Sequence, residues 1–240
     1  MSRGLGDVYK RQIDEIVKQM SLREKAMLLV GCESLVSKDS LTVYVPGAAG
    51  YTKSFPQYGI PSTVMADGPV GVRIFPIKVD GKRHYCTCFP SSTLLASTWD
   101  TQLVETQAGA MGEEAAVYDV DVILTPGINI MRNPLCGRNF EYFSEDPVLS
   151  GLMGAAMVNG VQSRGIGTSL KHFVANNQQV NKLNNDSRIP VKALREIYLK
   201  GFEICLQHSN PWTVMSSYNK IGGISVSYTH LRAHETCADL

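Results

Sequence analysis

The chain has 240 residues, of which 44% are hydrophobic, and its 23 basic and 22 acidic residues give a formal net charge of +1. This size and composition are typical of one large globular domain or two small ones. The balanced charge argues against a nucleic-acid or membrane-surface protein, since both usually concentrate a basic excess. No apolar run reaches the roughly 18 residues of a membrane span.

The amino-terminal stretch MSRGLGDVYKRQ has no apolar core, so it does not resemble a secretory signal. Six cysteines are scattered along the chain, and Cys86 and Cys88 form a Cys-x-Cys pair, unlike the Cys-x-x-Cys of zinc or redox sites. We expect reduced, mostly buried thiols. A cytoplasmic location is favoured, and a secreted or periplasmic one stays open if a signal peptide lies upstream.

The first predicted elements are two helices between residues 13 and 31. Apolar residues recur at helical spacing from Ile13 to Met20, and Ser21 with Glu24 forms a capping-box pattern that begins the second helix. Gly31 is expected to end it. A loop rich in glycine and proline follows over residues 37–61.

Short apolar strands and amphipathic helices alternate through the rest of the chain. Strands are predicted to end at Asp67 and to cover 120–127, 168–173 and 212–219, with intervening helices over 99–119, 144–165 and 190–209. Asp100 is a plausible N-cap for the first of these helices. This alternation predicts parallel βαβ units and an α/β fold.

Polar residues gather where the predicted strands end. Asp67, the Lys171–His172 pair and residues 216–218 all lie at such ends, which form the active-site rim of a (β/α)8 TIM-type barrel. An open doubly wound sheet would place ligands similarly, but no G-x-G-x-x-G or P-loop motif occurs. The barrel is therefore preferred.

Each of these polar residues also has a structural interpretation. Asp67, in ADGPVGVR, could bind paired hydroxyls or simply cap the following turn. Neighbouring strand residues point to opposite faces, so Lys171 and His172 reach one pocket only if the strand ends irregularly. The polar ANNQQ that follows them favours a site.

The segment GRNFEYFSEDP, residues 137–147, is rich in charges and aromatic rings. Its acids suggest a catalytic pair, but Ser144 followed by Glu145, Asp146 and Pro147 is typical of a helix start with Ser144 as N-cap. We interpret these acids as structural. Arg138 is the better ligand candidate, because its planar fork suits vicinal hydroxyls or a buried carboxylate.

Six segments in order resemble the N-terminal barrel domain of glycoside hydrolase family 3, the β-glucosidase family: LREKAMLLVG, GIPSTVMADGPVGVR, GRNFEYFSEDP, SLKHFVANNQ, ALREIYLKGFE and PWTVMSSYNKI. The resemblance implies that Asp67, Arg138, Lys171 and His172 hydrogen-bond the sugar ring in the −1 subsite, and that Tyr218 lines the same pocket. It implies the β-glucosidase/β-xylosidase branch, a small-molecule or oligosaccharide glycoside as substrate, and no metal or organic cofactor.

The resemblance also implies a retaining mechanism, with a carboxylate nucleophile and a second acid/base group. The family's nucleophile is an Asp in an SDW-like motif on a later strand, and its acid/base glutamate belongs to a following domain. This sequence contains no SDW. We therefore expect a truncated barrel domain over residues 13–225, with about five of the eight βα units of a TIM barrel, and an inactive chain.

Residues 1–12 and 226–240 look like a non-native leader and tail. Two other functions stay open: a sugar-binding remnant without turnover, and, much less favoured, a zinc protein that uses His230, His234 and Cys237. The sequence does not determine the sugar, the linkage or the oligomeric state.

Overall fold

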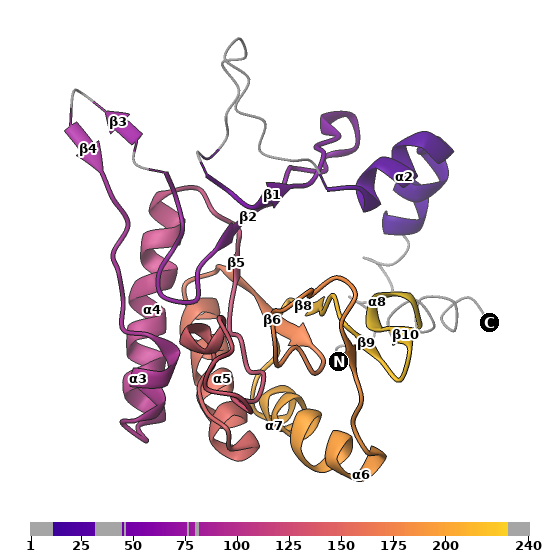
Figure 1. Cartoon of the computed structure of the whole chain (residues 1–240). Coiled ribbons are helices and arrows are strands. Elements are labelled where there is room, and N and C mark those ends of the chain that lie inside the picture. The colour runs from indigo at the N-terminus through magenta and orange to yellow at the C-terminus, as the bar shows by residue number, and fades with distance from the viewer. Residues whose placement is uncertain (1–11, 32–44, 46, 76, 80–81, 230–240) are drawn as a thin grey trace, which may run out of the picture.

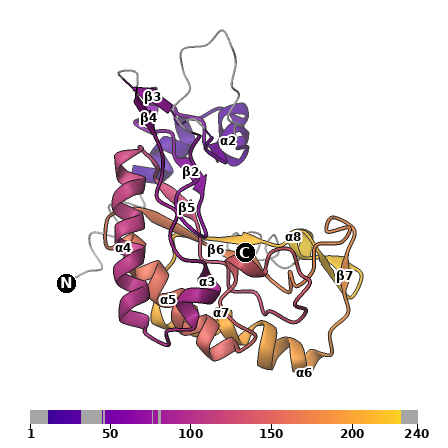
Figure 2. The ribbon, with the colours of Figure 1, turned by 60° about the vertical axis from the view of Figure 1, so that its left-hand side comes forward.

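The computed structural model describes residues 12–31, 45, 47–75, 77–79 and 82–229. Its centre is a curved five-stranded sheet with one layer of helices packed along one side (Figures 1 and 2). The candidate zinc ligands His230, His234 and Cys237, and most of the proposed leader and tail, lie outside the described residues.

The strands of the sheet follow one another in the order β1-β2-β5-β6-β8. Their bounds are β1 Gly50–Tyr51, β2 Val64–Asp67, β5 Val122–Leu124, β6 Gly167–Phe173 and β8 Thr213–Ser216. The last four are parallel, and β1 is antiparallel to β2. Among the described residues β1 and β8 do not pair, so the sheet is an incomplete barrel, as the sequence predicts.

A helical crossover connects each pair of neighbouring parallel strands. These helices are α4 (Thr101–Val117), α5 (Pro147–Gln162) and a composite crossover of α6 (Val191–Ala193), the π-helical turn η3 (Leu194–Tyr198) and α7 (Lys200–His208). Helix α5 packs between α4 and α7 (Figure 1). The predicted alternation of strands and helices is therefore confirmed.

Local signals set the helix starts, with one correction. Asp100 caps α4, because its Oδ1 accepts from the backbone N–H groups of residues 102 and 103. The prediction that Ser144 caps α5 is wrong: Asp146 is the N-cap and Pro147 the first helical residue. Ser144 instead accepts a hydrogen bond from the Asp146 N–H, so it supports the cap from outside the helix.

The main core lies between the sheet and the helices, and small residues allow close helix packing. Ile123 and Leu170 from the sheet are fully buried with Met111 and Met157 from α4 and α5. At Gly160 a Cβ atom would lie 2.2 Å from a backbone carbonyl of α4, so only glycine permits this approach.

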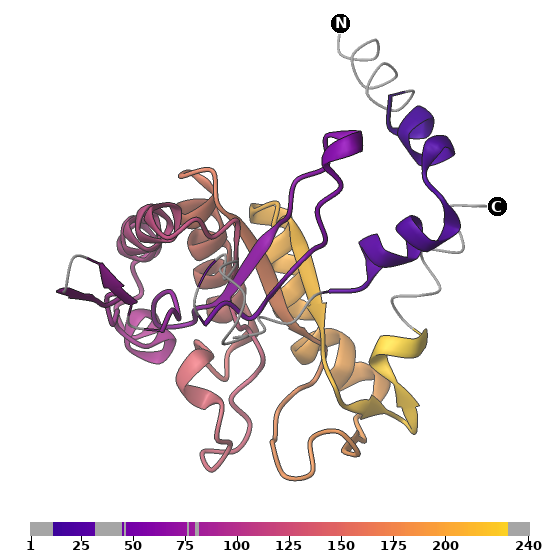
Figure 3. The same cartoon turned by 90° about the horizontal axis from the view of Figure 1, so that it is seen from above.

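Smaller elements surround this sheet. Residues 12–19 are helical, and Ser21 and Glu24 form the predicted capping box of the following helix, α2 (Leu22–Leu29). Figure 3 shows these two helices well apart from α4 and α5. The remaining elements are η1 Pro56–Tyr58, a hairpin of β3 Ile77–Val79 and β4 Lys82–His84, α3 Ser92–Ala96, η2 Asn139–Glu141, a small sheet of β7 Asp186–Ser187, β9 Lys220–Ile221 and β10 Ile224–Ser225, and α8 Val226–Thr229.

Strand β8 is the last strand of the main sheet and pairs only with β6 in the described structure. Thr213 and Val214 are exposed, and Trp212 before them is 58% exposed. Among the described residues, β8 is therefore an open edge of the sheet that exposes apolar side chains. No helix in the described part of the chain has the length and apolar character to cross a membrane. The cytoplasmic location stays a prediction.

Candidate functional site

A cleft of about 490 Å³ opens at the carboxyl ends of the parallel strands. Asp67 comes from the end of β2, Arg138 and Glu141 from the loop after β5, and Lys171 from β6. Its remaining walls are residues 69–74, residues 85–88 and Phe140. The volume is typical of a pocket for a small ligand.

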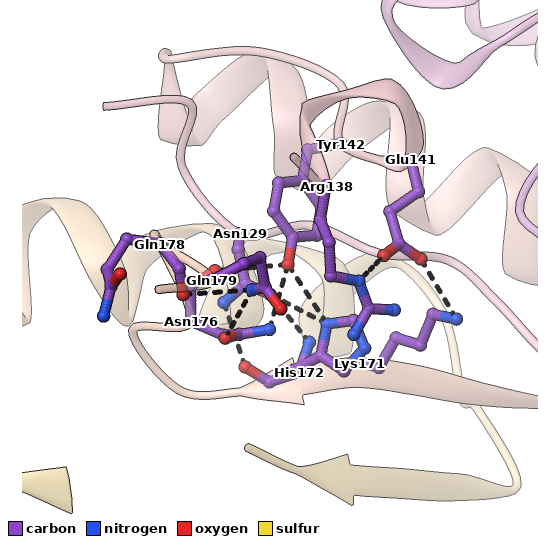
Figure 4. Close-up of polar contacts among 9 residues, drawn as sticks. All are labelled: Asn129, Arg138, Glu141, Tyr142, Lys171, His172, Asn176, Gln178 and Gln179. Atoms are coloured by element: carbon purple, nitrogen blue, oxygen red, sulfur yellow. Dashed lines mark hydrogen bonds and ion pairs between the residues drawn. The ribbon is translucent and has the colours of Figure 1, made fainter. Parts of the chain in front are cut away.

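Glu141 is the centre of a buried ion-pair group (Figure 4). Its side chain is 1% exposed; Oε1 pairs with the Arg138 Nε, and Oε2 lies 3.1 Å from the Nζ of Lys171, which is 2% exposed. Burial lowers the pKa of Lys171, and the Glu141 carboxylate opposes that shift. The carboxylate thus holds two cationic hydrogen-bond donors beside the cleft.

His172 belongs to a second buried network, which it shares with Tyr142 and Asn129 (Figure 4). Its Nδ1 lies 3.3 Å from the Tyr142 hydroxyl and 3.2 Å from the Asn129 Oδ1. Burial, together with the positive charges of Arg138 and Lys171, lowers the pKa of His172 to about 2. The ring is therefore neutral at physiological pH.

Strand β6 ends irregularly at this pair, as a shared site requires. Its register against β8 shifts between Lys171 and Phe173. The Lys171 backbone continues the pairing toward the β5 loop, where its N–H donates to the Pro126 carbonyl and its own carbonyl accepts from the Ile128 N–H, both at 2.9 Å. Lys171 lines the cleft, and His172 follows it directly in the chain.

Asp67 and the loop after it form the opposite wall. The Asp67 carboxylate is 38% exposed and lies 3.4 Å from the Arg73 Nη1, an exposed pair of little energetic weight. Gly71 has φ of 127°, and a Cβ there would lie 2.2 Å from the Thr87 carbonyl oxygen. Glycine is therefore required for this loop to contact residues 85–88.

Two free thiols, Cys86 and Cys88, also line the cleft. Cys88 is exposed, whereas partial burial raises the pKa of Cys86. Cys136 and Cys205 are buried free thiols, so half of the four described cysteines are buried and the expectation of mostly buried thiols is met only in part. Among the described residues, no group of three or more His, Cys, Asp or Glu side chains could hold a metal ion.

The structure separates Tyr218 from the other predicted residues. Tyr218 is 58% exposed and does not line the cleft. The Nζ of Lys182 lies over its ring, 5.3 Å from the ring centroid. Asp67, Arg138 and Lys171 share the cleft, His172 adjoins it, and Tyr218 lies elsewhere.

Sequence reasoning missed three members of the site. Glu141 belongs to the charged segment 137–147 but was not proposed as a site residue; it lies in the turn η2 and is buried between two cations. Its position three residues after Arg138 was the available signal. Asn129 and Tyr142 contact His172 across more than 29 residues of chain, and no local pattern marks them.

The fold and the cleft together define the chain as part of an α/β barrel with a polar cleft at the carboxyl ends of its strands. The chain belongs to glycoside hydrolase family 3, because the model "Glycosyl hydrolase family 3 N terminal domain" matches residues 57–234. The resemblance noted in the sequence is therefore confirmed.

Characterised relatives agree with this assignment. The chain is 44% identical over 215 residues to thermostable β-glucosidase B of Acetivibrio thermocellus, which covers 88% of the chain and 26% of that enzyme. It is 43% identical over 219 residues to an exo-α-(1→6)-L-arabinopyranosidase of Bifidobacterium longum, covering 89% of the chain and 27% of that protein.

Among solved structures, β-glucosidase 3B of Thermotoga neapolitana in complex with α-D-glucose matches with a TM-score of 0.85 and 51% identity, over 90% of this chain and 30% of that one. The chain thus spans about 26–30% of the length of these proteins.

Proposed function

We propose that the chain is the sugar-binding N-terminal part of a retaining glycosidase that acts on terminal β-linked glucosides or related glycosides. The observation that carries this proposal is the ion-pair group of Arg138, Glu141 and Lys171, which lies beside Asp67 in a cleft of sugar size. The glucose-bound Thermotoga structure supports it by analogy.

The chemistry of the cleft suits a sugar ring. Lys171 and Arg138 can only donate hydrogen bonds, whereas the Asp67 carboxylate can only accept them, so together they match hydroxyls that do both. Glu141 already pairs with two cations, so it is poorly suited to proton transfer. We assign it the task of orienting the two donors.

We further propose that residues 1–240 alone do not hydrolyse glycosides. Retaining hydrolysis needs a carboxylate nucleophile and a second acid/base group about 5–5.5 Å apart. The family's SDW-like nucleophile motif does not occur in this sequence. The second candidate function, a sugar-binding remnant, shares the same cleft and differs only in having no catalytic partner segment.

The sugar itself is a matter for experiment, because the relatives include both β-glucosidases and an α-L-arabinopyranosidase at similar identity. Calorimetric titration of the 240-residue chain with glucose and with L-arabinose tests binding directly. We expect Lys171→Met to abolish binding and Lys200→Met, on the exposed face of α7, to leave it unchanged. Equal binding by both variants would contradict the assignment.

Catalysis is tested with a chimera. The chain replaces the matching segment of Thermotoga neapolitana β-glucosidase 3B, and both proteins are assayed with an aryl β-glucoside. We expect turnover by the chimera and none by the isolated chain. Turnover by the isolated chain would refute its inactivity, and an inactive but folded chimera that fails to bind glucose would refute the glycosidase role.

A further inference from the structure

The orientation of the Asn129 amide is fixed by the backbone of His172. The His172 N–H donates to the Asn129 Oδ1 at 2.9 Å, and the Asn129 Nδ2 donates to the His172 carbonyl oxygen at 2.9 Å. A flipped amide would place the Asn129 NH2 against the His172 N–H and the Asn129 oxygen against the His172 carbonyl, so the oxygen must face the N–H. That same oxygen lies 3.2 Å from the His172 Nδ1.

The second neighbour of Nδ1 is the Tyr142 hydroxyl, whose proton is already used. Tyr142 donates to the Asn176 carbonyl oxygen at 3.2 Å and accepts from the Asn176 Nδ2 at 3.1 Å. Gln179 fixes the Asn176 amide, because the Gln179 Nε2 donates to the Asn176 Oδ1 at 3.1 Å. Toward His172, the Tyr142 oxygen therefore acts as an acceptor, 3.3 Å from Nδ1.

Two acceptors facing one ring nitrogen require that nitrogen to carry the proton. We propose that Asn129 and Tyr142 are positioning residues that hold His172 as the neutral Nδ1–H tautomer, so that Nε2 accepts a hydrogen bond from a sugar hydroxyl. Among the described residues, Nε2 has no hydrogen-bond partner, so its lone pair is free for a ligand. The acceptor role rests on the proposed sugar-binding function.

The charges around the ring favour the same state. Arg138, Lys171 and Lys182 all disfavour a positive charge on the His172 ring, so the ring stays neutral. An Nε2 acceptor beside these donors lets one hydroxyl donate to His172 while its oxygen accepts from a cation. The arrangement selects for a true hydroxyl, because an analogue that cannot donate leaves a buried acceptor unpaired.

The tautomer is tested first, in the 240-residue chain without sugar. Nitrogen-15 NMR of the labelled histidines distinguishes Nδ1–H from Nε2–H, and His172→Gln identifies the His172 signals. We expect Nδ1–H throughout pH ~5 to ~8. An Nε2–H ring, or an imidazolium at pH ~6, would overturn the proposal.

Variants separate positioning from folding. Tyr142→Phe removes one of the two acceptors with little change of volume, and Asn129→Ala removes the other; each should raise the Nε2–H fraction. The matched control is Asn159→Ala, because the Asn159 Nδ2 likewise donates to a histidine carbonyl, that of His208 at 3.2 Å. Unchanged His172 signals in folded Tyr142→Phe and Asn129→Ala would contradict the positioning role.

The acceptor role is tested by calorimetry with glucose and its monofluoro analogues, since fluorine can weakly accept but cannot donate. We expect one analogue to bind about tenfold more weakly than glucose, and His172→Phe to remove that difference. Equal discrimination by His172→Phe would refute the acceptor role. If glucose itself does not bind, both the proposed function and the acceptor role are refuted. The tautomer is tested by the NMR result alone.

Discussion

Replacing Glu141 by Gln tests the buried ion-pair group most directly. The substitution keeps the shape of the side chain and removes its charge, which leaves Lys171 at 2% exposure without a counter-ion. Breaking a buried pair by removing one partner costs about 3–5 kcal/mol. The variant can also avoid the unpaired charge if Lys171 loses its proton. At pH 7, starting from the ordinary pKa of 10.5, deprotonation costs about 1.36 × 3.5, or about 5 kcal/mol, which sets a similar upper limit on the loss of stability.

Deprotonation of Lys171 makes the loss of stability in Glu141→Gln depend on pH. In the variant, the folded pKa of Lys171 is depressed further, so between that value and 10.5 the unfolded chain binds a proton that the folded chain does not. Stability of the variant therefore rises with pH. At pH ~9 the cost of deprotonation is only about 1.36 × 1.5, or about 2 kcal/mol.

Urea unfolding of the original chain and of Glu141→Gln at pH ~7 and ~9 measures the difference between their free energies of unfolding. The matched control is Glu203→Gln, which removes the carboxylate of an exposed pair with Lys200 at 3.1 Å and should cost less than about 1 kcal/mol. A loss at pH ~7 as small as the control's, or a loss that does not shrink at pH ~9, would refute the buried-pair reasoning.

Three further predictions follow from burial and exposure. The pKa of His172 is about 2 in the folded chain and 6.5 in the unfolded chain, so below about pH 6.5 only the unfolded chain gains this proton, and the free energy of unfolding falls by about 2 kcal/mol at pH ~5. His172→Gln should remove this part of the pH dependence of urea unfolding. Parallel pH profiles of the variant and the original chain would contradict the prediction. Maleimide at pH ~7 should label the exposed Cys88 long before Cys205, because burial raises the pKa of the Cys205 thiol to about 11. Peptide mapping that finds both cysteines equally labelled in the folded chain would contradict the burial of Cys205. The open edge strand β8 predicts concentration-dependent association of the chain in light scattering. Val214→Lys places a charge on that edge and should reduce the association; association that the substitution leaves unchanged would contradict this role of β8.

Features that depend on nearby residues were predictable from the sequence. The strand ending at Asp67 and the caps at Ser21 and Asp100 follow from short-range patterns, and all three are confirmed. The cap of α5 was misplaced because Ser144 and Asp146 are both good N-cap residues two positions apart. Pro147 decides between them, since proline is favoured at the first helical position and Asp146 directly precedes it.

The polar contacts of the site depend on pairs that are distant in sequence, and no periodicity reports them. Asn129 and His172 are 43 residues apart, and Tyr142 and His172 are 30 apart. Tyr218 was placed near the rim because residues 216–218 end a predicted strand, and in the sugar pocket because of the resemblance. In the structure the Lys182 ammonium lies over its ring, outside the cleft.

The part of the site on this chain is built almost entirely from two successive loops. Arg138, Glu141 and Tyr142 follow β5, while Lys171 and His172 end β6, the strand paired beside it. Every ion pair and hydrogen bond described for these five side chains joins residues 129–179 to one another. Because adjacent parallel strands fix the relative position of their loops, β5 and β6 alone can set the two cationic donors and the His172 network, whereas the Asp67 acceptor depends on β2. Loss of glucose binding without loss of the His172 tautomer would therefore locate a defect in the β2 loop or in Lys171, and not in the packing of the two central strands.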